Sequence, residues 1–319
     1  MALSQRQVFT LLSAGVAVSI VALPIKVLSI EMNPQSDAVH QMNLFQAVVL
    51  GMVQGLTEFL PISSSAHLKV VPVILGWGDP GSAFTAVIQL GSIAAVLWYF
   101  WRDLTQITTG TIKAIRRSDY ASKDFRIALG ILLGTLPIIF LGVLIKILIP
   151  DFDNSPLRSL RAIAVASIGM SLLLVIAERM GQRKRDYNAL GLQDGIWMGL
   201  AQALAIIPGV SRSGSTLTAG LFMGLERAAA ARFSFLLGIP AITLAGLVEL
   251  KDALEEGLGS EQLIAYAVGT ISAAIFSYAA IAWLLRYLQT QNTWIFVWYR
   301  LAFGVAILGA IFSGLLKNS

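Results

Sequence analysis

The sequence predicts an all-α polytopic membrane protein, an inverted-topology repeat in which each half is one re-entrant helical hairpin plus three transmembrane helices. An extra hydrophobic segment precedes the two halves at the N-terminus. The mean hydropathy is +0.74 and only 13% of residues are charged, against about a quarter in soluble domains. Apolar runs of about twenty residues, enough to span a bilayer as a helix, recur along the chain. The runs are continuous, which argues against alternating β-barrel strands.

The apolar segments are of two kinds. Segments 43–76 and 191–224 are interrupted near their middles, by Pro61 in the first and by Pro208-Gly209 in the second. Proline breaks the hydrogen-bond ladder of a helix, and a broken helix at membrane depth must face protein or a water-filled cavity. Both segments are therefore predicted to be re-entrant hairpins. The uninterrupted spans are 8–30, 83–101, 127–149, 160–178, 233–250, 263–285 and 295–316.

The two interrupted segments match each other at an offset of 148 residues, with "GMVQGLTEFLPISSSA" (51–66) over "GLAQALAIIPGVSRSG" (199–214). Chance similarity between helices rich in small residues could produce such a match. The same order of elements after each segment favours a repeat, with halves 43–190 and 191–319 in one integral membrane domain. One hairpin plus three spans crosses the membrane an odd number of times, so the second half should be inverted. The identical pairs are Gly51/Gly199, Gln54/Gln202, Leu56/Leu204, Ser63/Ser211 and Ser65/Ser213.

Loop charges give the same topology. Loops 102–126 and 179–190 are rich in Lys and Arg, which predicts a cytoplasmic location. Loop 249–262 is mainly acidic and 150–158 holds a single basic residue, so both should lie outside. The first hairpin would then open outward and the second inward. The polar residues Glu226, Arg227 and Arg232 are predicted to form a solvated cytoplasmic rim.

Composition also limits the partners and the chemistry. A net charge of +5 and a pI near 9.6 could indicate nucleic acid, but the basic residues lie in short loops, as is usual in membrane proteins. No nucleic acid partner is expected. The chain has no cysteine, which excludes disulfides and thiolate chemistry. Residues 1–42 read either as an added transmembrane helix or as a cleaved signal peptide. The length of run 8–30 favours the helix.

Ionisable residues inside the membrane are candidates for function. Here they are Glu58, His67 and Arg212, with Lys69 at the edge. The repeat places Arg212 opposite Ser64, so the two hairpin tips should form one polar site. Arginine binds phosphate oxygens, and serine hydroxyls and N–H groups at the start of a half-helix bind anions. A carboxylate among them suggests a divalent cation or proton transfer. The site set is Glu58, Ser63, Ser64, Ser65, His67, Ser211, Arg212 and Ser213.

Each candidate also has a purely structural interpretation. Ser63–Ser65 could cap the helix after Pro61, Arg212 could be a counter-ion of Glu58, and His67 could simply be packed. Clustering at both tips favours a site. Gln89, in a span beside the first hairpin, either lines the pocket or bonds to a neighbouring helix. His40 lies in a polar linker and is not expected to take part.

The motifs "QGLTEFLPISSSAH" (54–67) and "PGVSRSGST" (208–216) resemble the two signature segments of the undecaprenyl-diphosphate phosphatase family, which is linked with bacitracin resistance. The resemblance covers about 43–316. It implies hydrolysis of undecaprenyl diphosphate to undecaprenyl phosphate and inorganic phosphate, which recycles the carrier for peptidoglycan and other envelope glycans. It also implies a site facing the outer side of the bacterial cytoplasmic membrane and a divalent cation, Mg²⁺ or Ca²⁺. The implied partners are the lipid substrate and the bilayer, with bacitracin competing for the substrate; a homodimer is allowed.

The resemblance also implies roles for individual residues. Glu58 would be a metal ligand or an acid/base, and Ser64 the nucleophile or a phosphate contact. His67 would be a nucleophile or an acid/base, and Arg212 would clamp the diphosphate. A direct attack by water with His67 as base stays open. The substrate-binding set is Gln54, Ser63, Ser65, Gln89, Ser211 and Ser213.

Two positions depart from a common pattern of the family. Gln54 stands where many members have Glu, which puts any mechanism with two carboxylates in doubt. Ala66 stands where many have Gly, and it restricts the backbone just before His67.

Two rival functions follow from the same features. Inverted repeats with broken helices are also transporter architecture, so a polyprenyl-phosphate flippase or an ion-coupled transporter is the main alternative. The type-2 phosphatidate phosphatases use two histidines with an arginine. Only His67 lies in the predicted membrane region, so that alternative fails.

Overall fold

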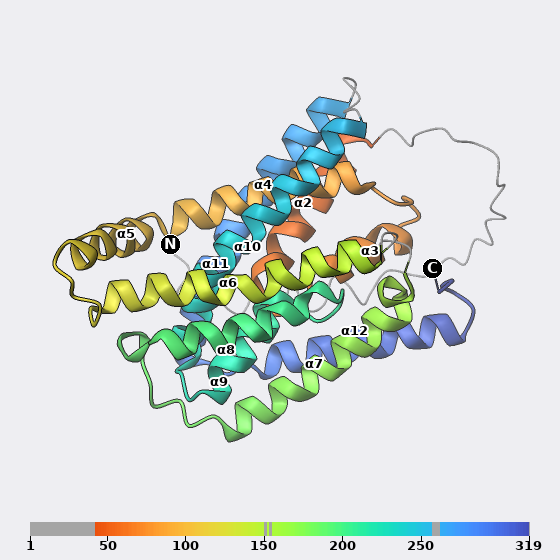
Figure 1. The fold of residues 1–319 in the computed structure, drawn as a ribbon. Coiled ribbons are helices and arrows are strands. Elements are labelled where there is room, and N and C mark those ends of the chain that lie inside the picture. Colours follow the sequence, from red (N-terminus) through yellow and green to blue (C-terminus); the bar gives the residue numbers. More distant parts are fainter. Residues whose placement is uncertain (1–41, 150–151, 153–154, 257–261, 319) are drawn as a thin grey trace, which may run out of the picture. The chain divides into compact units, whose positions relative to one another are not determined.

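The computed structural model describes residues 42–149, 152, 155–256 and 262–318 (Figure 1). Apart from one isolated bridge between Arg185 and Leu225, the regular secondary structure of these residues is helical. The predicted all-α fold is confirmed. The predicted segment 8–30 and His40 lie outside the described residues.

The helices follow the predicted order. The first half contains α2 (Leu44–Phe59), α3 (Ser64–Ile74), α4 (Ser82–Tyr99), α5 (Trp101–Arg116), α6 (Lys123–Leu148), the short η2 (Pro156–Arg158) and α7 (Leu160–Met180). After the short η3 (Tyr187–Ala189), the second half contains α8 (Leu192–Ala203), η4 (Leu204–Ile206), α9 (Arg212–Phe222), α10 (Arg227–Glu256), α11 (Leu263–Thr290) and α12 (Trp294–Phe312).

Five of the described helices are long and apolar enough to cross a membrane: α6, α7, α10, α11 and α12. A sixth span is obtained if α4 and α5, bent by 65° at Phe100, count as one. This agrees with a multi-pass membrane protein. Helix α2 is also apolar but has only 16 residues.

Residues 102–126 were predicted to be a loop, and that prediction is wrong for most of the segment. Helix α5 continues to Arg116, with Asp103 in its first turn and Lys113 and Arg116 in its last. These charges suit the two ends of the helix dipole, and the apolar residues recur at helical spacing. A high content of Lys and Arg is found in cytoplasmic loops and in amphipathic helices alike, so it does not distinguish between them.

Both predicted helix breaks are present. Helix α2 begins with a capping box, in which Asn43 and Gln46 each bond to the other's backbone N–H. It ends at Phe59, just before Pro61, and α3 starts at Ser64. In the second half, the chain passes from α8 through η4 and Pro208 to α9.

The halves interlock by close helix packing. Helix α2 lies along α11 and α8 lies along α6 (Figure 1). Helix α4 also packs on α11 and α10 on α6, while α7 packs on α12. A Cβ on Gly51 would lie 2.2 Å from the carbonyl oxygen of Gly269, and a Cβ on Gly199 would lie 2.2 Å from that of Gly134. Only glycine permits these backbones to approach so closely.

The predicted solvated rim is partly an ion-pair network. Arg227 pairs with Glu178, which is buried at the end of α7, and Arg183 pairs with the same carboxylate. Arg232 pairs with Asp103 of α5. The arginines were predicted to be solvated, but they form ion pairs because a buried carboxylate requires partners. The paired residues are distant from each other along the chain, so the sequence alone did not indicate the pairs.

Candidate functional site

Glu58 lies at the centre of the polar residues between the two hairpin turns. It is close to the end of α2, and its Oε2 accepts a hydrogen bond of 2.7 Å from Ser64 Oγ and one of 3.3 Å from Gln54 Nε2. Its Oε1 lies 3.4 Å from Arg212 Nη2, across from the other hairpin. The structure thus brings Ser64 and Arg212 together at Glu58, as expected if the two tips meet, and Gln54 joins them through its bond to Glu58.

Arg212 is the first residue of helix α9, and most of its N–H groups make no hydrogen bond to the described residues. The Arg212 and Glu58 side chains are each 10% exposed. Within the described residues, Arg212 Nε and Nη1 are buried without a hydrogen-bond partner. Buried N–H groups of a guanidinium are costly to leave unpaired. The free donors of Arg212 suit an additional anion, which a counter-ion role towards Glu58 alone would not require.

Gly238 of α10 makes room for the Arg212 guanidinium. A Cβ on this glycine would lie only 1.4 Å from Arg212 Nη1. The side chain therefore rests directly on the backbone of α10. Its position is fixed by packing as well as by Glu58.

The serines of the two turns have matching conformations. Ser63 and Ser211 have positive φ angles of 76° and 72°, which non-glycine residues rarely adopt. Ser63 Oγ lies 3.2 Å from Ser65 Oγ, and Ser211 Oγ lies 3.3 Å from Ser213 Oγ. Ser213 Oγ also donates to the Leu60 carbonyl over 3.0 Å, which joins the turns.

Ser211 caps its helix, whereas Ser63, for which capping was one interpretation, does not. Ser211 Oγ accepts the Gly214 N–H over 3.1 Å and so caps α9. Ser63 makes no side-chain cap on α3. The Ser63 hydroxyl therefore leaves the first N–H groups of α3 uncapped, and N–H groups in this position can bind an anion.

His67 lies in a different environment from Glu58. It is 4% exposed on α3, where its Nδ1 lies 2.7 Å from the Ser63 carbonyl oxygen and its Nε2 lies 2.6 Å from Tyr299 Oη. Phe303 stacks on the ring. None of the hydrogen bonds between described residues joins His67 to Glu58 or Arg212. Its partner Tyr299 was not among the predicted site residues.

Arg300 is the second residue that sequence reasoning missed. It is 1% exposed on α12. Its Nη1 donates to the Pro61 carbonyl over 3.0 Å, and its Nη2 donates to the Gly209 and Val210 carbonyls over 2.8 and 3.0 Å. A charged residue inside the apolar run 295–316 was the available signal.

Gln54 belongs to the Glu58 cluster, whereas Gln89 lies apart from it. Gln54 Nε2 also reaches Ser92 Oγ over 3.4 Å, and Ser277 donates to the same hydroxyl over 2.8 Å. Gln89 is half-buried on α4, where its amide faces Gly246 of α10. Among the described residues, no hydrogen bond links it to the other candidates.

Glu58 is the only carboxylate among the candidate site residues. The described residues contain no group of three or more His, Cys, Asp and Glu that could hold a metal ion. A cation here would therefore have Glu58 as its protein ligand and would depend on substrate oxygens for the rest, an arrangement that suits Mg²⁺.

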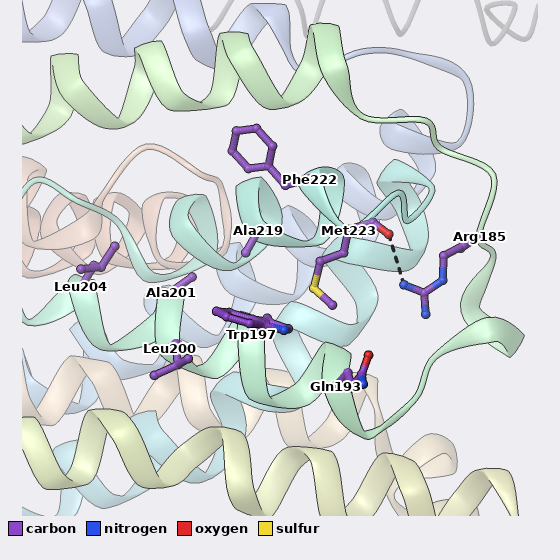
Figure 2. Close-up of a pocket in the computed structure, with 9 residues that line it drawn as sticks. All are labelled: Arg185, Gln193, Trp197, Leu200, Ala201, Leu204, Ala219, Phe222 and Met223. Carbon is purple, nitrogen blue, oxygen red and sulfur yellow. Dashed lines mark hydrogen bonds between the residues drawn. The ribbon is translucent and has the colours of Figure 1, made fainter.

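A hollow of about 610 Å³ lies between α8 and α9, on the second hairpin (Figure 2). Its wall is mainly apolar, and Arg185 at its edge donates to the Met223 carbonyl over 3.1 Å. None of the candidate site residues lines it. The lining residues are Arg185, Gln193, Trp197, Leu200, Ala201, Leu204, Ala219, Phe222 and Met223.

Comparison with known proteins identifies the family. The family model described as bacitracin resistance protein BacA matches residues 47–306. This chain belongs to that family. A relative from Trichormus variabilis, named undecaprenyl-diphosphatase, is 67% identical over the full length of both chains. Relatives with the same name come from Synechocystis, 62% identical over 94% of this chain and 91% of that one, and from Gloeobacter violaceus, 54% identical over 88% and 96%.

The family match covers every candidate site residue, from Gln54 to Ser213, together with Tyr299 and Arg300. The family and membrane character expected from the sequence are thus confirmed.

Proposed function

We propose that this chain is an undecaprenyl-diphosphatase, which hydrolyses undecaprenyl diphosphate to undecaprenyl phosphate and inorganic phosphate. Its family and its relatives' names support this activity. The observation that carries it is the Arg212 guanidinium, which is buried beside Glu58 and has two nitrogens without a hydrogen-bond partner among the described residues. A diphosphate supplies the acceptors that these donors need. The product returns to peptidoglycan and envelope-glycan synthesis, and bacitracin competes for the same lipid, which links the activity to resistance.

The first step binds the diphosphate. Arg212 contacts phosphate oxygens, and the uncapped N–H groups at the start of α3 add neutral donors. Ser63, Ser65, Ser211 and Ser213 shape the two turns around the anion. Such fixed donors act mainly by stabilising the charge of the transferred phosphoryl group.

The second step transfers the terminal phosphoryl group to Ser64. Ser64 Oγ attacks the terminal phosphorus while its proton passes to Glu58, whose Oε2 is 2.7 Å away. The bond from phosphorus to the bridging oxygen breaks, and undecaprenyl phosphate leaves with the electron pair. Glu58 gives its proton to the leaving lipid phosphate and so regains its negative charge. Water then attacks the phosphoserine while Glu58 accepts a proton from it. The bond from phosphorus to Ser64 Oγ breaks, Glu58 returns the proton to Oγ, and inorganic phosphate departs. Direct attack by water and attack by His67 are the alternatives.

The residues fit a divalent cation that is shared with the substrate. Glu58 would hold Mg²⁺ or Ca²⁺ together with diphosphate oxygens. The ion would supply positive charge to the phosphate oxygens. Because Gln54 is neutral, this chain would bind the cation weakly without substrate.

The finer architecture is proposed as an inverted repeat of 43–190 and 191–319. The packing of α2 on α11 mirrors that of α8 on α6, as α4 on α11 mirrors α10 on α6. The equivalent residues Gly51 and Gly199 make equivalent backbone contacts, and Ser63 and Ser211 share one unusual conformation. The loop charges favour a site open to the outer side of the cytoplasmic membrane. A homodimer stays a prediction.

Phosphate release by the purified chain in detergent tests this function. Wild type should release phosphate from undecaprenyl diphosphate, lose activity with chelator, and regain it with Mg²⁺ or Ca²⁺. Arg212→Ala should lower kcat/KM at least about 100-fold, the effect of losing a fixed donor to the transition state. Arg117→Ala, at an exposed position, serves as the matched control.

Failure of wild type to release phosphate with either cation would contradict the function and favour lipid transport. Retained turnover in Arg212→Ala, with unfolding temperature unchanged, would remove the clamp role.

A further inference from the structure

We propose that Tyr299 of α12 is a positioning residue that acts through His67 on the Ser63–Ser64 turn. The proposal rests on the phosphatase function above. Tyr299 holds the His67 ring in place, and His67 in turn holds the turn that carries the nucleophile without touching substrate itself.

The hydrogen bonds of His67 fix its tautomer. A carbonyl oxygen only accepts, so Nδ1, 2.7 Å from the Ser63 oxygen, carries the proton. In the neutral ring Nε2 then has the lone pair, and Tyr299 Oη, 2.6 Å away, donates to it. The Phe303 ring stacks at 4.4 Å and 10° from the imidazole plane, which fixes the ring orientation as well.

This arrangement leaves His67 without a free nitrogen. Both ring nitrogens are bonded, and the ring is buried between aromatic side chains. Attack on phosphorus or removal of a proton needs a lone pair that faces the reacting atoms. In this geometry the imidazole acts instead through the bond from Nδ1 to the Ser63 carbonyl.

The Ser63 turn needs an external support. Its φ of 76° is strained for a serine and persists only where the surroundings hold it. Ser211 has nearly the same φ, but its own hydroxyl caps the Gly214 N–H. Ser63 has no such cap. The residue that matches His67 in the second hairpin is Ser215, so the imidazole support belongs to the first turn alone.

The first turn is held by the hydrogen bond from His67 rather than by a serine cap, and this difference has a functional advantage. A hydroxyl cap on α3 would occupy backbone N–H groups that can bind phosphate. The His67 bond holds the turn from its carbonyl side and leaves those groups free. The next residue of α12, Arg300, binds the Pro61 carbonyl of the same turn over 3.0 Å. Tyr299 and Arg300 together therefore set the direction of Ser64 towards Glu58.

Tyr299→Phe removes the hydroxyl but keeps the ring. We expect kcat to fall about tenfold, the effect of one lost hydrogen bond in the network, with KM nearly unchanged because Tyr299 does not touch substrate. The matched control is Tyr278→Phe, which alters an exposed ring on α11.

His67 variants separate positioning from direct chemistry. The amide nitrogen of asparagine occupies the place of Nδ1, so His67→Asn should keep far more activity than His67→Ala or His67→Gln. The double variant His67→Ala/Tyr299→Phe should be no slower than His67→Ala alone, because Tyr299 acts through the imidazole. Multiplied losses in the double variant, or His67→Asn as inactive as His67→Ala, would overturn the proposal.

Nitrogen-15 NMR tests the same contact without any turnover. The chain has only two histidines, so labelled histidine gives two ring spectra, and His40→Asn identifies the one from His67. Wild type should show Nδ1 protonated and Nε2 accepting, with the Nε2 signal displaced in Tyr299→Phe. An unchanged Nε2 signal would overturn the proposal. An inactive wild type with the expected spectra would count against the phosphatase function alone.

Discussion

Arg300 donates hydrogen bonds to backbone carbonyls of both hairpin turns, so one guanidinium holds the two halves of the site together. It also donates to the Ser167 carbonyl over 3.3 Å. All these acceptors are main-chain oxygens, which any sequence provides. No motif could therefore reveal this contact, although the charge inside an apolar helix could have drawn attention to it.

Arg300→Met should destabilise the protein by about 3 kcal/mol or more, because several buried carbonyl oxygens lose their donor. Unfolding in detergent, followed by a thermal or denaturant titration, measures the change. The exposed Arg117→Met is the control. Equal stability of Arg300→Met and wild type would show that water or other donors replace the guanidinium.

For single residues, the sequence indicated which polar side chains lie at the site, but it did not indicate all of their hydrogen-bond partners. Glu58 contacts both Ser64 and Arg212, as the alignment of the two interrupted segments led us to expect. Tyr299, the partner of His67, is 232 residues away along the chain. That pairing depends on how α12 packs, which neither motif spacing nor composition specifies.

Among the elements, the two broken segments were predictable because proline occurs there together with serine or glycine. Pro61 is followed by three serines and Pro208 by Gly209, whereas the prolines within apolar runs lie inside α3, α6 and α10 without ending them. Helix α5 was missed because its low hydropathy and charge resemble those of a loop. Its helical state shows in the spacing of apolar residues, a weaker signal.

The contact between α9 and α10 gives a prediction for Gly238. Gly238→Ala places a methyl group where the Arg212 guanidinium now lies. The long side chain can move aside, so the fold should persist while kcat/KM falls about 100-fold from the misplaced donor. Phosphate release and thermal unfolding, measured on the same sample, check both parts.

Gly309→Ala is the control for that substitution, because a Cβ there meets no atom within 4 Å. Both changes add one methyl group to the interior of a helix. Equal activity of the two variants would show that Arg212 does not need its present position.

For the whole molecule, the proposed inverted topology makes opposite predictions for two loops. Helix α6 separates Tyr120, before it, from Leu157, after it, and these side chains are 57% and 43% exposed. The basic loop containing Tyr120 should be cytoplasmic and the loop containing Leu157 external.

The absence of cysteine from the chain makes this test direct. A membrane-impermeant maleimide added to intact cells should label Leu157→Cys, and it should label Tyr120→Cys only after permeabilisation. Labelling of both from outside would contradict a single crossing by α6, and the reverse pattern would invert the orientation.

The central claim is that Ser64, hydrogen-bonded to Glu58, receives the phosphoryl group. The most direct measurement uses undecaprenyl diphosphate with a radioactive terminal phosphate, a rapid denaturing quench at neutral pH, and peptide mapping. The account predicts label on Ser64 during turnover and none in Ser64→Ala, which should also be inactive. Label on His67, or full turnover by Ser64→Ala, would contradict it.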